Sequence, residues 1–337
     1  MAAAERPQQD ASVVVTIDTE PDNAWEDHLN PSVANVRELL RLQELLGRYG
    51  ASPTCMVTSR VLQSAEAVDV LRELVAGGAE IGAHLHPWES PPFVASGMDT
   101  RHPTFPHELP VDVFEDKLRG LIEAISERFD APTSYRGGRW GIATEHLPIL
   151  EAAGLEVDTT VTPLVDWRST MGIPARENGT GGVDFRFAPT RPYHPNYEDV
   201  TSEGDARITE IPLTVGFTRR LPAIVRRTYF ALPELGRRLM RKLGLARPVL
   251  AEPAGERVEW LTKMVRVVLA QRPPAVNIAL HSSELMVGGS PWSKTRADVD
   301  RIFSRMDSIL RILSAEHSCV FTTLTDAARR WNGTHAQ

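Results

Sequence analysis

Alternating strand and helix patterns predict an α/β protein with a parallel sheet, and they favour a barrel over an open, doubly wound sheet. Short β-branched runs alternate with longer segments of helical periodicity along most of the 337 residues, and repeated strand-then-helix units give parallel strands. No glycine-rich phosphate-binding loop follows the first strand, where a dinucleotide-binding fold carries one. In a barrel, the chemistry is expected at the carboxyl ends of the strands.

Each predicted element depends on a local pattern in the sequence. The first strand, 13–18, is a short apolar run rich in valine. The helix at about 32–49 keeps an apolar period of 3.6 residues and stops at Gly50. By the same signals, further strands are predicted at 54–58, 79–84, 134–136, 155–160, 275–281 and 319–322. Further helices are predicted at 65–76, 111–129, 144–153, 256–270, 294–313 and after the last strand.

The chain is expected to form a single domain over residues 12–331, preceded by a disordered N-terminus at 1–11. An irregular stretch and a basic segment interrupt the alternation and predict an insertion at about 168–255. The N-terminus shows neither the basic nor the apolar region of a signal peptide, and the sequence has no run of 18 apolar residues. A cytoplasmic location is therefore expected.

The charge is unevenly distributed. The formal net charge of −7 argues against a nucleic-acid-binding function, yet residues 219–247 contain nine arginines and lysines and a single acid, Glu234. Leucines recur in this segment at helical spacing, which predicts a basic amphipathic helix or a pair of helices. Two interpretations stay open. The segment contacts anionic headgroups at the inner face of a membrane, or it packs its leucines on the main domain and leaves its arginines in solvent.

Two predicted strand ends carry the residue types of a metal site. Asp18 and Glu20 lie two residues apart at the end of the first strand, and His84 and His86 lie two apart at the end of the third. Alternate residues of an extended chain face the same way, so each pair is expected to point into one site. Two imidazoles and a carboxylate form a three-ligand set with one position open, as expected for a catalytic divalent metal.

Two further strand ends and several tryptophans complete the predicted site. Arg136 ends the fourth strand beside paired glycines, and its charge would keep a neighbouring carboxylate ionised. His281 ends the apolar strand near the C-terminus. Trp88, Trp140 and Trp167 lie beside these segments, and their flat faces suit stacking on a sugar ring.

These pieces, in this order, resemble the motifs of the polysaccharide deacetylases, carbohydrate esterase family 4. The resemblance extends from about residue 13 to residue 284, and its short motifs match at 16–20, 80–87, 135–140, 166–167 and 280–281. The chain departs from the family pattern at two points. Thr19 replaces the second aspartate of the first motif, so the ligand role is assigned to Glu20. The family's two histidines lie four residues apart, whereas here the second histidine is His86 and Trp88 takes the later position.

The resemblance implies a distorted (β/α)7 barrel and a metal-dependent hydrolase. The reaction it implies is removal of an N-acyl group, expected to be acetyl, from an amino sugar of a glycan or a lipid-linked sugar. Asp18 would be the catalytic base, Arg136 its partner and His281 the general acid. A divalent ion, expected to be zinc, would bind the Glu20, His84 and His86 set.

Two alternatives to this function stay open. The altered first two motifs permit a hydrolase of a non-peptide amide that uses the same fold without metal. A non-catalytic carbohydrate-binding relative is the other alternative. Retention of Asp18, Arg136 and His281 together argues against it, because binding alone requires neither a base nor an acid.

Overall fold

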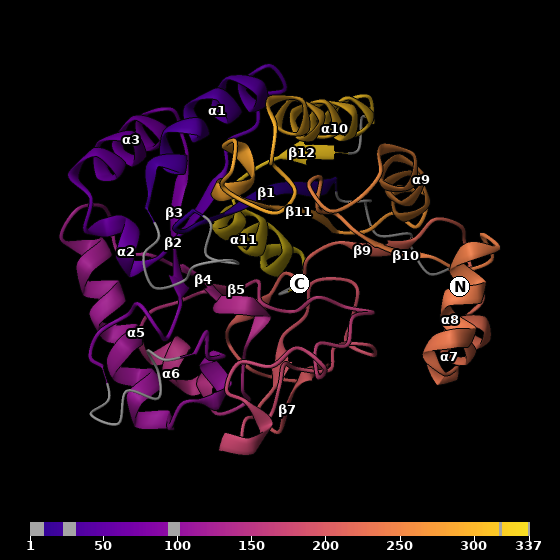
Figure 1. Cartoon of the computed structure of the whole chain (residues 1–337), viewed down its shortest axis with the longest axis horizontal. Helices are drawn as coiled ribbons and strands as arrows, with labels where there is room; N and C mark the ends of the chain where they lie inside the picture. The colour runs from indigo at the N-terminus through magenta and orange to yellow at the C-terminus, as the bar shows by residue number, and fades with distance from the viewer. Residues whose placement is uncertain (1–9, 23–31, 94–101, 317–318, 336–337) are drawn as a thin grey trace, which may run out of the picture.

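A parallel sheet of eight strands runs through the centre of the computed structural model, which describes residues 10–22, 32–93, 102–316 and 319–335 (Figure 1). Its strands are β1 (Ala11–Thr19), β2 (Thr54–Val57), β3 (Glu80–Leu85), β4 (Ser134–Gly137), β5 (Val157–Asp158), β8 (Thr209–Glu210), β11 (Ala275–His281) and β12 (Cys319–Phe321). They follow the order β11-β1-β2-β3-β4-β5-β8, with β12 paired to the first residues of β1. The curled sheet confirms the distorted (β/α)7 barrel expected from the sequence.

Helices surround the outside of the curled sheet, as the alternating pattern predicted (Figure 1). They are α1 (Leu39–Gly47), α2 (Ser59–Leu62), α3 (Ala65–Ala76), α5 (Val111–Ser126), α6 (His146–Ala152), α9 (Val258–Leu269) and α10 (Arg296–Ser314). Short 3-10 turns precede α1 and follow β4 and β11; they are η1 (Ala34–Glu38), η3 (Gly138–Trp140) and η5 (Ser282–Leu285).

The two faces of β1 show why its sequence is so apolar. Val13, Val15 and Ile17 belong to the large core that the outer helices share. Residues of the alternate set, Val14 and Thr16, point into the barrel, Val14 toward apolar neighbours and Thr16 toward polar ones. Both faces are covered, so all nine residues of the strand are buried.

The last helix, α11 (Leu324–His335), closes the amino-terminal end of the barrel. The Oγ1 of Thr325 donates to Glu80 at the start of β3, at 2.6 Å. Arg329 pairs with Glu156, just before β5, at 2.7 Å. Because this end is closed, the carboxyl ends of the strands are left as the open end of the barrel.

A loop completes the barrel between its two edge strands. β8 and β11 form no ladder with each other. Instead the backbone N–H of Thr214 donates to the carbonyl of Asn277 at 3.0 Å, and the N–H of Asn277 donates to Thr214 Oγ1 at 2.8 Å. These two bonds tie the segment after β8 to the middle of β11.

The basic segment forms a helical hairpin at the periphery of the molecule (Figure 1). Its helices are α7 (Ala223–Ala231) and α8 (Glu234–Lys242), and the two-stranded ribbon of β9 (Val215–Phe217) and β10 (Pro248–Leu250) connects it to the barrel. Only Tyr229 and Phe230 of these helices are buried. No helix of the described residues is both long and apolar enough to cross a bilayer.

The structure departs from the expected elements in a few places. The predicted disordered N-terminus, 1–11, lies largely outside the described residues, and its last residue, Ala11, already belongs to β1. β8 lies within the range 168–255 and pairs with β5, so the main sheet continues through the segment expected to be an insertion. A small second ribbon, β6 (Pro195–Asn196) and β7 (Asp199–Glu203), also lies there. The insertion boundaries themselves stay a prediction.

Candidate functional site

A cavity of about 320 Å³ lies at the carboxyl ends of the strands and brings together nearly all residues predicted for the site. Its lining includes Asp18, Glu20, His84, His86, His281, Trp88, Trp140, Trp167 and Trp292. Arg136 does not line the cavity; its fully buried side chain contacts Asp18 from within the barrel. Parallel strands present their carboxyl ends on one side of a barrel, which explains how residues so far apart in sequence meet.

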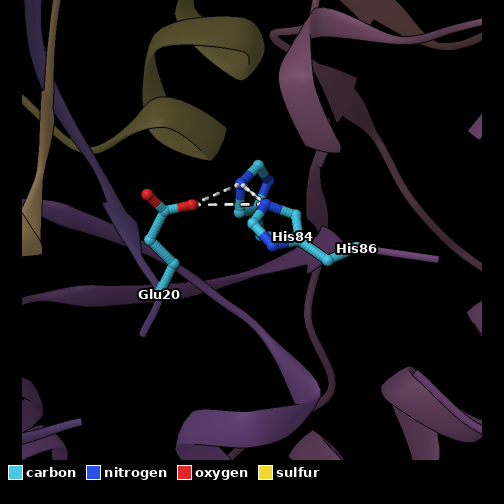
Figure 2. Close-up of side chains that lie close together, drawn as sticks. All are labelled: Glu20, His84 and His86. Atoms are coloured by element: carbon cyan, nitrogen blue, oxygen red, sulfur yellow. Dashed lines mark hydrogen bonds and ion pairs between the residues drawn. The ribbon is translucent and has the colours of Figure 1, made fainter. Parts of the chain in front are cut away.

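Glu20, His84 and His86 direct their donor atoms toward one point (Figure 2). The Nε2 of His86 lies 3.0 Å from Nε2 of His84 and 3.2 Å from Oε2 of Glu20, and the remaining pair of atoms is 3.8 Å apart. A tetrahedral zinc ion with ligands at about 2.0–2.1 Å holds its ligand atoms about 3.3 Å apart. The three buried donors therefore fit a small divalent ion and leave one position open.

Hydrogen bonding and charge around the two histidines also suit a cation. The Nδ1 of His84 donates to the carbonyl of Arg136 at 2.9 Å, which leaves the lone pair of Nε2 facing the other donors. Burial acts to lower the pKa of His84, but the carboxylates of Asp18 and Glu20 raise it, so positive charge is favoured at this point. Burial and His84 hold the pKa of His86 well below its ordinary value, so His86 is neutral and able to donate its lone pair.

His86 is held in place from three sides. The Trp88 ring stacks on it with centroids 4.3 Å apart, and its Nδ1 lies 3.5 Å from Oε1 of Glu89. Burial raises the pKa of Glu89 to about 8. On the third side, a Cβ added to Gly138 would lie 2.5 Å from Cδ2 of His86 and 2.6 Å from the carbonyl oxygen of Leu85. A glycine is thus required at position 138, because a side chain there would displace the His86 imidazole.

Asp18 is held as an anion by its neighbours. Nη1 of Arg136 donates to its Oδ1, and Nη2 of the same guanidinium donates to Thr16 Oγ1 at 2.6 Å. Burial acts to raise the pKa of Asp18, but Arg136, assisted by His84 and His281, holds it far below the ordinary range. Asp18 is therefore ionised at neutral pH, as a general base requires.

His281 has the opposite charge preference. Its Nδ1 lies 3.2 Å from Oε1 of Glu284, whose Oε2 also accepts the backbone N–H of His281 at 3.0 Å. Burial acts to lower the pKa of His281, but the Glu284 carboxylate raises it well above the ordinary value. The Nε2 of His281 lies 3.6 Å from Oδ2 of Asp18. A proton donor and a proton acceptor thus lie side by side at the cavity.

The tryptophans surround the polar residues of the cavity. The Arg136 guanidinium lies over the Trp140 ring, 4.9 Å from the ring centroid. Arg139 and Trp140 form a turn in which their φ angles are positive, 55° and 60°. Such conformations cost free energy and are concentrated at functional sites. The Nε1 of Trp167 donates to Thr162 at 2.7 Å. Trp292 is 42% exposed, so its ring is available to a ligand.

Several residues of the site were not predicted from the sequence. Glu252 lines the cavity from the loop after β10, and burial raises its pKa to about 7; no motif or strand end of the main sheet marks it. Glu89 and Glu284 each follow the histidine they contact by three residues, and that spacing was the available signal. Asp166 of the fourth resembling motif instead pairs with Arg168 at 2.8 Å and does not line the cavity.

Comparison with known proteins gives a fold rather than a close relative. No family model matches the sequence, and no curated protein is similar to it in sequence. A crystal structure from Mycobacterium smegmatis, described as a polysaccharide deacetylase, matches 99% of this chain and 94% of its own at a TM-score of 0.53 and 14% identity. The chain has the fold of the polysaccharide deacetylases. The PuuE allantoinase shares this polysaccharide deacetylase fold, over 99% of this chain and 96% of its own, with a TM-score of 0.50 and 16% identity.

Proposed function

We propose that the protein is a metal-dependent hydrolase that removes an N-acyl group, acetyl in the simplest case, from an amino sugar of a glycan or glycolipid precursor. One observation carries the proposal. The Glu20, His84 and His86 set lies in the same cavity as a base held ionised by an arginine and an acid held protonated by a glutamate. The deacetylase fold supports it.

The donor set gives the site its electrophilic component. A divalent ion, with zinc as the proposed identity, would be held by Glu20, His84 and His86 and would supply a water of lowered pKa and polarisation of the acyl oxygen. An amide needs this help because its carbonyl is a poor electrophile and its amine a poor leaving group.

The protein's own residues then move the two protons of the reaction. Asp18 accepts a proton from the attacking water as the water oxygen bonds to the acyl carbon. His281 donates a proton to the amide nitrogen as the carbon–nitrogen bond breaks, which releases a free amine and a carboxylic acid. Arg136 keeps Asp18 oriented and ionised, and Glu284 keeps His281 oriented and protonated.

The lining of the cavity favours a sugar as the substrate. Trp88, Trp140, Trp167 and Trp292 line the cavity together with its polar groups, a combination suited to the apolar face and hydroxyl edge of a pyranose ring. A carbohydrate substrate agrees with the name of the Mycobacterium smegmatis neighbour.

Release of acetate from N-acetylated amino-sugar oligomers, measured with and without a chelator, tests the proposal. We expect turnover that falls at least a hundredfold on metal removal and returns when zinc is added. His86→Ala should abolish the metal response. The matched control, His194→Ala, should not, because His194 contacts the Ile208 carbonyl outside the cavity. Turnover that is unaffected by metal removal would overturn the proposal.

A metal-independent hydrolase of a non-peptide amide is the second candidate, and the fold shared with the PuuE allantoinase favours it. It makes a different prediction, since the metal-free protein would hydrolyse a cyclic ureide and His86→Ala would retain that activity. A carbohydrate-binding relative without catalysis would bind the sugar and turn over neither substrate.

We also propose that the sugar is lipid-linked and that the protein is a cytoplasmic one with peripheral contact at the inner membrane face through residues 219–247. The exposed leucines of the hairpin support membrane contact rather than packing on the main domain. Leu235, Leu239 and Leu243 are 80%, 54% and 60% exposed, among arginines. Apolar side chains flanked by cations are typical of interfacial helices.

A further inference from the structure

A second cavity, of about 540 Å³, lies beside the start of β11. The loop after β9, the first turn of α7 and the end of α9 enclose it. His281 is at the opposite end of β11, about 20 Å away at about 3.3 Å per strand residue. None of the described residues lines both cavities, so the second one is separate from the candidate active site.

The charge of this second cavity is one-sided. The arginines that line it are Arg191, Arg219, Arg220, Arg226 and Arg272, and its lining contains no aspartate or glutamate among the described residues. Arg191 has a partner, Glu203, at 3.1 Å. In the part of the chain that the structure describes, no carboxylate lies within ion-pair distance of Arg219, Arg220 or Arg226.

These arginines form a concave patch of positive charge that is open to solvent, since Arg191, Arg219, Arg220 and Arg272 are exposed and Arg226 is half-buried. Positive charges gathered on one concave surface create a local positive potential that attracts anions. The chain as a whole carries a net charge of −7, so carboxylates were available to neutralise these arginines and are absent from the lining.

We propose that this arginine pocket binds the phosphate group of a phosphorylated ligand. Guanidinium groups bind phosphate oxygens through paired hydrogen bonds, and a phosphate offers enough oxygens for several arginines at once, whereas a carboxylate offers two. Val215, Phe217, Leu221 and Val268 line the same cavity and suit the organic part of the ligand. The shared chemistry is that of a phosphate ester, which either a membrane phospholipid or a soluble phosphate compound supplies.

Calorimetric titration of the full-length protein with pyrophosphate tests the pocket. We expect saturable binding that the triple variant Arg219→Gln/Arg220→Gln/Arg226→Gln weakens at least tenfold. Replacement of the same three arginines by lysine keeps the charge and loses the paired geometry, so affinity should be intermediate. The matched control, Arg72→Gln/Arg119→Gln/Arg176→Gln, removes the same charge from exposed positions elsewhere and should leave affinity unchanged.

The unliganded triple glutamine variant gives an independent readout of folding. Arg219 and Arg220 are exposed and Arg226 is half-buried, so the melting temperature of this variant should stay close to that of the wild type in phosphate-free buffer. A lower value would mean that these arginines stabilise the fold, and it would overturn the proposal. Equal loss of pyrophosphate affinity in the control triple variant would also overturn it, because binding would then depend on net charge alone.

A second arm separates the two sources of the phosphate. If a lipid headgroup occupies the pocket, sedimentation with phosphatidylglycerol–phosphatidylcholine vesicles should be abolished by the triple variant. It should persist in Arg227→Gln/Arg238→Gln/Lys242→Gln, which removes the same charge from the basic segment outside the pocket. If the wild type binds pyrophosphate but not these vesicles, the phosphate compound is soluble. Both results support the pocket and differ only in source, whereas binding of neither pyrophosphate nor vesicles at low salt overturns it. None of these outcomes depends on deacetylase activity.

Discussion

Asp18 and His281 lie 3.6 Å apart and yet need opposite protonation states. Each has its own partner, Arg136 for the carboxylate and Glu284 for the imidazole. These partners move the two pKa values in opposite directions from their ordinary values, Asp18 downward and His281 upward. This separation allows one cavity to accept and donate a proton at the same pH.

Replacement of Asp18 tests its assignment as a base rather than a metal ligand. Asp18→Asn should lower kcat/KM by about 10²–10⁴-fold, the range for loss of general base catalysis. Metal content, measured by elemental analysis, should stay near that of the wild type. Asp166→Asn is the matched control, since its carboxylate pairs with Arg168 outside the cavity. Joint loss of activity and metal would reassign Asp18 as a ligand.

The ionisation of His281 should be detectable in the pH dependence of kcat/KM. Removing the Glu284 anion takes away the main charge that raises the pKa of His281. His281 then loses its proton at lower pH, so Glu284→Gln should shift the alkaline limb of the kcat/KM profile toward lower pH. Glu259→Gln on the exposed side of α9 should leave that limb in place. An unchanged limb in Glu284→Gln would show that His281 is not the acid.

At the scale of elements, the turn after β4 positions the end of β3. Gly138 lies so close to the His86 ring that an added Cβ would meet it at 2.5 Å and the Leu85 carbonyl at 2.6 Å. Gly138→Ala should therefore displace His86 and weaken metal binding about 10–100-fold in equilibrium dialysis. Gly47→Ala is the control, because nothing lies within 4 Å of a Cβ there. Equal metal affinity in wild type and Gly138→Ala would argue against His86 as a ligand.

The pairing of β5 with β8 places two carboxyl groups opposite each other. Asp158 and Glu210 are register partners, both are fully buried, and Oδ2 of the first and Oε2 of the second have no hydrogen-bond partner among the described residues. Burial, followed by their mutual repulsion, raises the pKa of Glu210, and burial raises that of Asp158. A single proton shared between Asp158 and Glu210 would give both unpartnered oxygens a hydrogen bond.

This pair makes stability depend on pH. A carboxyl whose pKa is higher in the folded state contributes stability that is complete below its unfolded pKa of about 4 and is lost as pH rises through the folded value. Glu210→Gln supplies a permanent donor and should stabilise the protein by roughly 1–3 kcal/mol at alkaline pH. Melting temperatures measured from pH 5 to 9 should fall less steeply for Glu210→Gln than for the wild type. Parallel curves would contradict the shared proton.

At the scale of the whole molecule, local sequence patterns determined most of the architecture. β1 and β11 are long apolar runs with a titratable residue, Asp18 or His281, at or next to the last position, so both their position and the convergence of their ends were predictable. β8 contains only two residues, too short for any periodic signal, and its position follows from pairing with β5. Glu252 follows Ala251, whose carbonyl accepts the backbone N–H of Ala279 in β11 at 3.0 Å, so tertiary structure rather than local sequence determines its place.

Anomalous diffraction from a crystal loaded with zinc tests the central claim most directly. The account predicts one strong peak within about 2.0–2.2 Å of Nε2 of His84, Nε2 of His86 and a carboxylate oxygen of Glu20. The peak should disappear in a His86→Ala crystal grown under the same conditions. Absence of a peak at these three residues, or a peak coordinated by other side chains, would contradict it.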